Sequence, residues 1–168
     1  MVVLNLDNEI TNSFAPKAKG NVMQFSRVAR PEKGYYLRND GMICRVEGAA
    51  ETEIFPADEI LIPGVHNIEN YMAAFCAVDG LVPVSVMEQL AKNFGGVAHR
   101  IELVRVKDGV KYYDSSIDSS PNRTRAALRS FHQKVIMVAG GKDKGIGYDD
   151  LGPDLQAHVK LLVLTGMT

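Results

Sequence analysis

The chain has 168 residues, with 19 Lys and Arg against 20 Asp and Glu, so its formal net charge is −1 at pH 7. This length fits one ordinary domain or two small ones and allows a hydrophobic core. The balanced charge excludes a global field that would attract nucleic acid or an acidic membrane. The longest apolar run lies within Val159–Leu164 and is far too short to span a bilayer, and the apolar residues 1–4 are followed at once by polar ones, which excludes a signal peptide.

Two features bear on the setting of the chain. Cys44 and Cys76 lack metal-ligand spacing, so we interpret them as reduced thiols of a cytosolic protein, with a disulfide as the less favoured alternative. Strand patterns stand close to both ends, at Val2–Asn5 and Lys160–Thr165, and a parallel α/β layer normally continues with a helix after such a strand. The sequence therefore predicts a fragment of a longer protein, cut at both ends.

The first part of the chain predicts a β layer followed by two helices. The Asp40-Gly41 pair between β-rich runs predicts a tight hairpin turn, and residues 21–62 are expected to be mainly antiparallel. A helix is expected from Gly64 to about Val78 with Asn67 as its N-cap, and another over Val84–Asn93. The strands are expected at Met1–Leu6, Val22–Ser26, Tyr35–Arg38, Met42–Val46 and Glu51–Phe55.

Gly95-Gly96 is the best hinge candidate, so we place a domain boundary within 94–98 and expect domains at 1–97 and 98–168. The second part alternates strands and helices after a hairpin, which predicts an α/β fold with a parallel sheet and right-handed crossovers. Ser120 is expected to cap the first of its helices, which begins at Pro121. The expected elements are strands at Arg100–Val106 and Gly109–Tyr113, a helix at Pro121–Phe131, a strand at Val135–Ala139, a helix at Asp149–Ala157 and a strand at Lys160–Thr165.

This order places Asp114 and the Gly140-Gly141 pair at the carboxyl ends of two strands, Lys111–Tyr113 and Val135–Ala139, which we expect to be parallel neighbours. In an open α/β sheet that edge is where ligands bind, because helix N-termini and free backbone N–H groups gather there. The sequence therefore predicts a ligand site at this edge.

The loop Asp114–Ser120 holds two carboxylates and four hydroxyls between a strand end and a helix N-terminus. Such a loop can hold a sugar hydroxyl or an anionic ligand. The alternative interpretation is a capped turn with solvated serines.

The loop Gly140–Gly145 lacks the spacing and the Lys-Ser/Thr ending of a Walker loop. It offers a flexible backbone and the ammonium groups of Lys142 and Lys144, which suit a carboxylate or phosphate of a substrate. The alternative is a mobile surface turn.

A pair of asparagines and one arginine complete the set of candidate residues. Asn67 and Asn70 lie within one helical turn, and their amides can both donate to and accept from a purine edge, although helix capping is the commoner role. Arg100, just past the hinge, could clamp phosphates from one domain onto a nucleotide held by the other. A plain surface arginine is the alternative.

Taken together and in this order, these pieces resemble the Mur ligases of peptidoglycan synthesis, in particular those that add D-glutamate to UDP-N-acetylmuramoyl-L-alanine. The likeness covers nearly the whole chain and is specific as a set. The residues that carry it are Val3–Asp7, Gly64–Ala74, His99–Glu102, Tyr113–Ser115 and Gly140–Lys144.

The resemblance implies a fold and a reaction. The fold is the end of the Mur ligase central domain, a β-rich layer plus helices without the phosphate-binding loop, followed by part of a Rossmann-like C-terminal domain. The reaction is an ATP- and Mg²⁺-dependent amide ligation in the cytoplasm, in which ATP phosphorylates the carboxylate of UDP-N-acetylmuramoyl-L-alanine and the amine of D-glutamate displaces phosphate.

The resemblance also implies roles for individual residues. Asn67 and Asn70 would approach adenine, Arg100 the phosphates and Asp114 the ribose. Lys144, with Ser119 and Asp118, would lie near the incoming amino acid, and Arg100 and Lys144 would serve catalysis. No metal ligand is expected in the chain, because the Mg²⁺ ligands of the family precede its first residue.

The sequence departs from the family pattern in the loop after Asp114. Many relatives carry a lysine two residues after this Asp and a Thr-Asn pair further on, where this chain has Ser116, Asp118 and Ser119. Asp118 beside an anionic amino acid would be repulsive unless Lys144 or Arg123 offsets it. Because the phosphate-binding loop and the metal ligands are absent, we expect the chain by itself to be inactive.

Alternatives remain open at this point. Within the enzyme class they are another Mur ligase and a folylpolyglutamate synthetase; outside it they are a stand-alone nucleotide- or anion-binding module and a purely structural fragment. Strand edges at Val2–Leu4 and Leu161–Leu164 would invite pairing with another copy of the chain.

Overall fold

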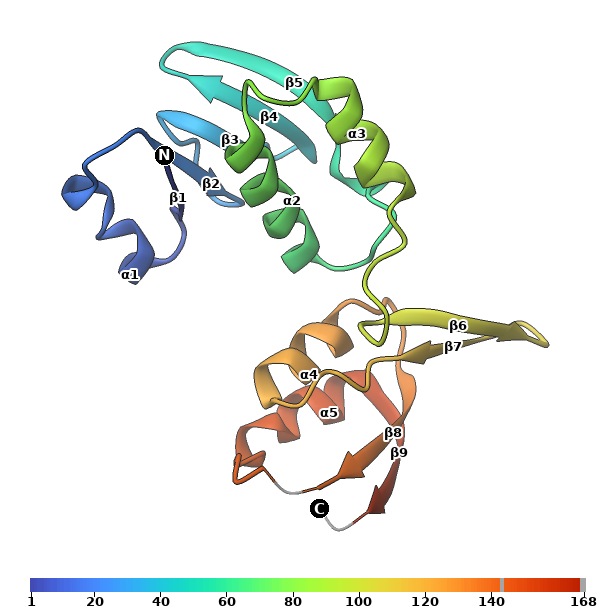
Figure 1. Cartoon of the computed structure of the whole chain (residues 1–168). Helices are drawn as coiled ribbons and strands as arrows, with labels where there is room; N and C mark the ends of the chain where they lie inside the picture. Colours follow the sequence, from blue (N-terminus) through green and yellow to red (C-terminus); the bar gives the residue numbers. More distant parts are fainter. Residues whose placement is uncertain (143, 167–168) are drawn as a thin grey trace. The chain divides into compact units, whose positions relative to one another are not determined.

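The structure, a computed structural model, describes residues 1–142 and 144–166. The chain forms two compact units, Met1–Phe94 and Gly95–Thr168, and each is described by itself. Figure 1 shows the elements of both units. The division follows Phe94, within the stretch expected for the boundary; which domains of a longer protein the two units represent stays a prediction.

The first unit is built on a five-stranded sheet in the order β1-β2-β3-β4-β5. Strands β1, β2 and β3 are parallel, whereas β3, β4 and β5 are antiparallel and include the predicted hairpin around Asp40-Gly41. The strands are β1 (Val2–Asn5), β2 (Val22–Ser26), β3 (Lys33–Leu37), β4 (Met42–Glu47) and β5 (Ala50–Pro56).

The prediction of a mainly antiparallel layer over 21–62 is confirmed for β3, β4 and β5, whereas the pair β2/β3 is parallel. The connection 27–32 crosses back to the start of β3, so that Gln24 pairs with Gly34 in parallel register. A Cβ atom at Gly34 would stand 1.8 Å from the carbonyl oxygen of Gln24, and the φ of Gly34 is +142°. The parallel pair thus depends on a residue without a side chain, which a strand pattern does not reveal.

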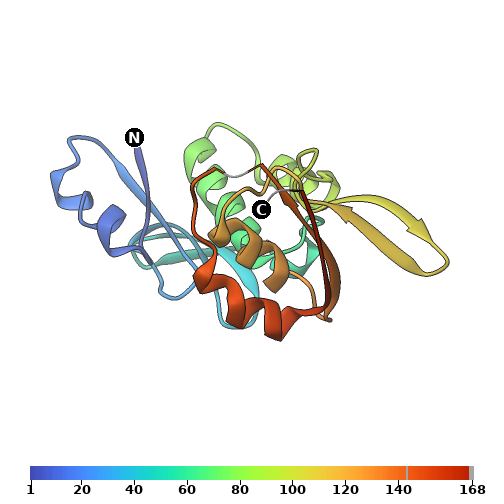
Figure 2. The same cartoon turned by 90° about the horizontal axis from the view of Figure 1, so that it is seen from below.

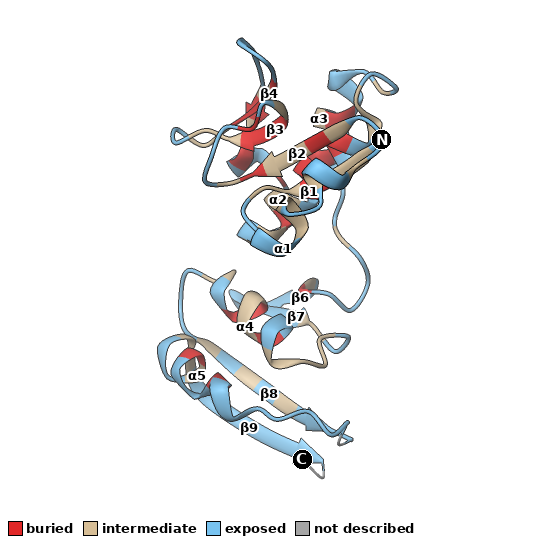
Figure 3. Cartoon of the chain, turned by 90° about the vertical axis from the view of Figure 1, so that its left-hand side faces the viewer, coloured by how far each residue is buried: buried red, intermediate tan, exposed pale blue. Residues whose placement is uncertain are grey.

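Helices cover this sheet and close the core. α2 contacts β1, β2 and β3, and α3 contacts β5. The buried face of α2 carries Tyr71, Met72, Phe75 and Cys76, whereas Ala74 is exposed. Figure 3 shows the buried residues concentrated in the sheet and in these two helices. The helices are α1 (Glu9–Asn12), η1 (Ala15–Lys17), η2 (Ala57–Glu59), α2 (Val65–Val78) and α3 (Val84–Asn93).

A polar cluster ties the end of α2 to the sheet. The Tyr35 hydroxyl donates to Asp79 Oδ1 over 2.8 Å, and Arg45 donates to both oxygens of Asp79 over 2.7 and 2.9 Å. The Arg45 guanidinium lowers the pKa of Asp79, while burial raises the pKa of Tyr35. Because all three polar groups find partners, the buried Tyr35 side chain adds packing without an unpaired hydroxyl.

The two cysteines behave as predicted. Cys44 and Cys76 are buried and are free thiols. Burial raises the pKa of Cys44 to about 11 and that of Cys76 to about 12, so both are unreactive core residues.

The second unit combines an antiparallel hairpin, β6/β7, with a parallel pair, β8/β9, and two helices (Figure 2). Buried Asp154 of α5 accepts hydrogen bonds from Arg125 Nε (2.7 Å) and Arg129 Nε (2.8 Å), which holds α5 on α4. No helix in the described parts of the chain is both long and apolar enough to cross a membrane. The elements are β6 (Glu102–Lys107), β7 (Val110–Asp114), α4 (Pro121–Arg129), β8 (Val135–Gly141), η3 (Asp149–Leu151), α5 (Gly152–His158) and β9 (Val159–Gly166).

One expectation about this unit is wrong. β7 is hydrogen-bonded only to β6 in the described structure, so it is not the parallel neighbour of β8. The order strand–helix–strand correctly predicts the parallel pair β8/β9, but it cannot say which strands become neighbours. A short Asp108-Gly109 turn gives β7 a local antiparallel partner. Asp114 and Gly140 therefore do not end adjacent strands of one sheet.

Candidate nucleotide-binding site

The first turn of α2 carries the two predicted asparagines, and the structure gives them different roles. The helix begins at Val65, so Gly64, with a φ of +104°, is the N-cap residue and the prediction of Asn67 as N-cap is wrong. Asn67 is buried, and its Nδ2 donates to the carbonyl of Pro63 over 2.6 Å. An N-cap side chain would instead accept from a helix N–H.

Asn70 is exposed, and its Nδ2 donates to Asn67 Oδ1 over 3.3 Å. The side-chain oxygen of Asn70, Oδ1, has no hydrogen-bond partner in the described structure. Both polar atoms of the Asn67 side chain are therefore hydrogen-bonded within the protein, and one of them holds the Asn70 amide in place. The free side-chain oxygen of Asn70 can accept a hydrogen bond from an exocyclic amine. Of the two predicted base contacts, only Asn70 offers a free atom.

The carboxyl ends of β1 and β2 lie beside this turn. Asp7 follows β1 and accepts hydrogen bonds from the Ser26 hydroxyl and from the backbone N–H of Arg27. The Arg27 guanidinium forms an ion pair with Glu69, which lies between the two asparagines on α2. Sequence reasoning assigned no role to Ser26 or Arg27, although Asp7 after a strand was a signal for this edge.

In the second unit the predicted Asp114 is held on both of its oxygens. His99 Nδ1 lies 2.8 Å from Asp114 Oδ2, and the Ser116 N–H donates to Oδ1 over 2.9 Å. The hydrogen bond from His99 is the main reason why the pKa of Asp114 falls to about 2, and Asp114 in turn raises the pKa of His99. Each oxygen keeps a further lone pair that can accept from a sugar hydroxyl.

Arg100 is exposed, and its guanidinium makes no hydrogen bond or ion pair within residues 1–142 and 144–166. The residues on either side are in the left-handed region, with φ of 64° for His99 and 48° for Ile101. Such a conformation is an outlier for a β-branched residue and costs about 1–3 kcal/mol. Strained backbone around an unpaired cation is typical of a ligand-binding position.

The remaining loop residues take part in turn structure. The Ser115 hydroxyl donates to Asp118 Oδ2 over 2.7 Å, and the Tyr148 hydroxyl donates to the Ser119 carbonyl over 3.4 Å. Ser120 is the N-cap residue of α4, as predicted, but its side chain makes no capping hydrogen bond. One carboxylate oxygen of Asp118 is thus hydrogen-bonded within its own loop.

Lys142 and Lys144 are exposed beyond the end of β8, and Asp143 of the same loop lies outside the described residues. No hydrogen bond or ion pair joins Lys144 to Asp118 or Ser119 in the described structure. The grouping of Lys144 with those residues therefore stays a prediction.

Three donor groups, those of His99, Glu102 and Asp114, have ligand atoms within 4.8 Å of one another. Glu102 Oε2 already accepts from the His99 backbone N–H over 2.8 Å, and His99 Nδ1 is bonded to Asp114. The arrangement is that of a hydrogen-bonded network, in which the atoms that would bind an ion bind one another.

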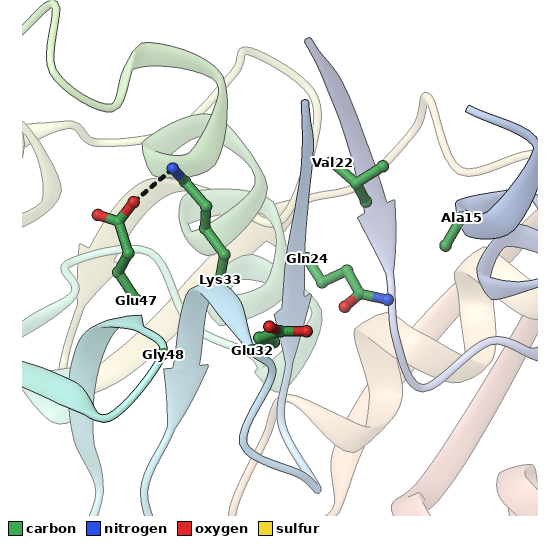
Figure 4. A pocket seen from close by; sticks show the side chains of 7 residues that line it. All are labelled: Ala15, Val22, Gln24, Glu32, Lys33, Glu47 and Gly48. Atoms are coloured by element: carbon green, nitrogen blue, oxygen red, sulfur yellow. Dashed lines mark hydrogen bonds and ion pairs between the residues drawn. The ribbon is translucent and has the colours of Figure 1, made fainter. Parts of the chain in front are cut away.

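A hollow of about 490 Å³ lies elsewhere in the first unit, and Figure 4 shows its lining. It includes Val22 and Lys33, the first residues of β2 and β3, so it lies at the amino ends of these strands, opposite Asp7. An ion pair of 2.6 Å between Lys33 and Glu47 spans one side (Figure 4). None of the predicted site residues lines it.

Comparison with solved structures identifies the fold. No family model matches the chain. The fold matches a UDP-N-acetylmuramoylalanyl-D-glutamyl-2,6-diaminopimelate–D-alanyl-D-alanyl ligase from Acinetobacter baumannii with a TM-score of 0.65 at 19% identity, over 98% of this chain and 38% of that one. It matches the MurF ligase of Thermotoga maritima, solved in complex with ADP, with a TM-score of 0.62 at 16% identity, over 98% of this chain and 43% of that one. The fold is thus that of the Mur ligases.

Comparison with curated sequences narrows the likeness to one kind of Mur ligase. The chain is 54% identical over 167 residues to the UDP-N-acetylmuramoylalanine–D-glutamate ligase of Acetivibrio thermocellus, and 52% identical to that of Ruminiclostridium cellulolyticum. In both cases 99% of this chain is covered, and the chain spans about a third (36%) of the relative's length. The resemblance to the D-glutamate-adding Mur ligases is confirmed over the whole chain.

Proposed function

We propose that the chain forms part of a cytoplasmic ATP-dependent ligase that adds D-glutamate to UDP-N-acetylmuramoyl-L-alanine in peptidoglycan synthesis. The observation that carries this proposal is the 54% identity over 167 residues to a ligase of that name. In the proposed assignment, 1–97 belongs to the central ATP-binding domain and 98–168 to the C-terminal domain that binds the amino acid.

The proposed reaction has two steps. An oxygen of the substrate carboxylate attacks the γ-phosphorus of ATP, which forms an acyl phosphate and releases ADP. The amine of D-glutamate then attacks the acyl carbon, and the tetrahedral intermediate expels phosphate and loses a proton to leave the amide. Mg²⁺, when bound, would neutralise charge on the transferring oxygens, and we propose that its ligands lie outside this chain.

The proposed roles follow from which atoms are free. The side-chain oxygen of Asn70 would accept a hydrogen bond from the adenine amine, while Asn67 holds the Asn70 side chain in that orientation. Arg100 would neutralise phosphate charge, since its guanidinium is unpaired in the described structure. Asp114 would accept from ribose hydroxyls with the lone pairs that His99 and Ser116 leave free.

The amino-acid site is proposed on different grounds. Lys144, exposed near the end of β8, would bind a carboxylate of D-glutamate. Ser119 and Asp118 stay proposed contacts of the same amino acid.

Pairing of two copies of the chain through β1 or β9 is a separate expectation, because these strands end their sheets in the described structure. Light scattering tests it.

Titration of the ¹⁵N-labelled 168-residue chain with ADP tests the nucleotide part of this proposal. We expect shifts of the Asn70 side-chain amide, of Arg100 Nε–H and of the amides of 114–116. Affinity should be weak, with a dissociation constant on the order of 1 mM, because few contacts are available. GDP, which presents a carbonyl in place of the adenine amine, should leave Asn70 unmoved.

Two outcomes would contradict the proposal. One is a set of ADP-induced shifts confined to residues away from Asn70, Arg100 and Asp114. The other is micromolar binding without Mg²⁺, which would favour a stand-alone nucleotide-binding module.

A further inference from the structure

The turn that carries Arg100 is held by the loop after β7 and by hydrogen bonds to Val97 and Glu102 on either side of it. The Ile101 N–H donates to the Ser115 hydroxyl over 3.2 Å, and the Ile117 N–H donates to the His99 carbonyl over 3.3 Å. The His99 N–H donates to Glu102 over 2.8 Å, and the Ile101 side chain is buried. These contacts hold two residues with positive φ, so the direction in which Arg100 leaves the backbone is fixed by its neighbours.

The same turn supplies the imidazole that meets Asp114. His99 is thus joined to the loop 114–118 twice, through its side chain and through its backbone carbonyl. Its side chain is 63% exposed, so it contributes little to the core, and burial alone does not explain the contact.

We propose that His99 is a positioning residue for nucleotide binding, which orients Asp114 through Nδ1 and Arg100 through the strained turn. This inference rests on the proposed function, because it takes Asp114 and Arg100 as the nucleotide contacts. His99 itself touches neither ribose nor phosphate. It keeps one carboxylate rotamer and one arginine direction in place before the ligand arrives, which reduces the ordering cost of binding.

The groups that face the imidazole set its pH behaviour. They are Asp114 at the end of β7 and Glu102 at the start of β6, whose Oε2 accepts from the His99 backbone N–H. Asp114 and Glu102 raise the pKa of His99 above its ordinary value of 6.5, with Asp114 the larger cause. The pair of charged groups is therefore favoured below that raised pKa and is lost as the pH rises through it; the neutral imidazole can still donate from Nδ1.

The first test is a pH titration of the histidine ring signals of the labelled chain without nucleotide. We expect the midpoint of His99 to lie above 6.5 and to fall when Asp114→Asn removes the carboxylate charge. An unchanged His99 midpoint in Asp114→Asn would overturn the inference, because the imidazole would then not be bonded to Asp114 in solution.

The second test separates the imidazole donor from backbone strain. His99→Gly relieves the positive φ but has no donor, whereas His99→Asn tolerates positive φ and keeps an amide donor near the place of Nδ1. We expect the ADP dissociation constant to rise about tenfold in His99→Gly and to stay within about twofold of the wild-type value in His99→Asn. Equal binding by His99→Gly and the wild-type chain would overturn the inference.

The two tests also distinguish this inference from the proposed function. If ADP does not perturb Arg100 and Asp114 in the wild-type chain, the proposed function fails whatever His99 does. If ADP perturbs them but His99 titrates independently of Asp114, the proposed function stands and the positioning role is wrong.

Discussion

Gly34→Ala is expected to unfold the first unit. The new Cβ would stand 1.8 Å from the carbonyl oxygen of Gln24 and 2.8 Å from its backbone nitrogen, so β2 and β3 would have to separate. Neighbouring backbone cannot move aside as a flexible side chain can. We expect a loss of more than about 4 kcal/mol in the free energy of unfolding, which places the change among the severe ones.

Gly48→Ala is the matched control for this substitution. Gly48 also has a positive φ, of +58°, but a Cβ there would meet nothing within 4 Å. Its cost is limited to the left-handed conformation, about 1 kcal/mol. Urea unfolding followed by the amide signals of residues 1–94 measures both changes, and equal stabilities of the two variants would contradict the parallel β2/β3 register.

Arg100→Met is expected to have the largest effect on activity. The test uses a chimeric ligase, in which this chain replaces the 167 matching residues of the Acetivibrio thermocellus ligase. Loss of one cationic donor to a transferring phosphoryl group typically costs about 10²–10³ in rate, so we expect kcat/KM for ATP to fall by that factor. Arg100→Lys should retain part of the activity, because an ammonium keeps the charge without the planar fork.

Arg105→Met in the same chimera is the control for charge alone. Arg105 is exposed on β6, in the same unit, and has no assigned role. Its change should leave kcat/KM within about twofold. If Arg100→Met also left kcat/KM within about twofold, Arg100 would be a plain surface residue and its proposed role in phosphate binding would be wrong.

Local patterns in the sequence predicted the elements well. The helix Val84–Asn93 and the strand Val22–Ser26 have the predicted bounds, because apolar spacing and flanking Pro or Gly residues define them locally. Both Asp-Gly turns formed hairpins for the same reason. Adjacency between distant strands depends on tertiary contacts, so the β2/β3 pairing and the separation of β7 from β8 could not be read from these patterns.

In the candidate site, too, local residue types were predictable and tertiary contacts were not. Residue types predicted Asn70, Arg100 and Asp114 as candidates, but burial of Asn67 and the contact between His99 and Asp114 depend on geometry. The Asp108-Gly109 turn is a partial signal for the second contact, because it brings the segments before β6 and after β7 side by side. A bulge between Leu103 and Arg105 shifts the register by one residue, so the turn alone does not say which residue faces His99.

Phosphate release by the chimeric ligase, with ATP, Mg²⁺ and UDP-N-acetylmuramoyl-L-alanine, tests the central proposal most directly. We expect release to depend on D-glutamate, to fall to background with L-alanine, meso-diaminopimelate or D-alanyl-D-alanine in its place, and to be absent for the 168-residue chain alone. Release that ignores D-glutamate and follows another amino acid, or turnover by the isolated chain, would contradict the assignment.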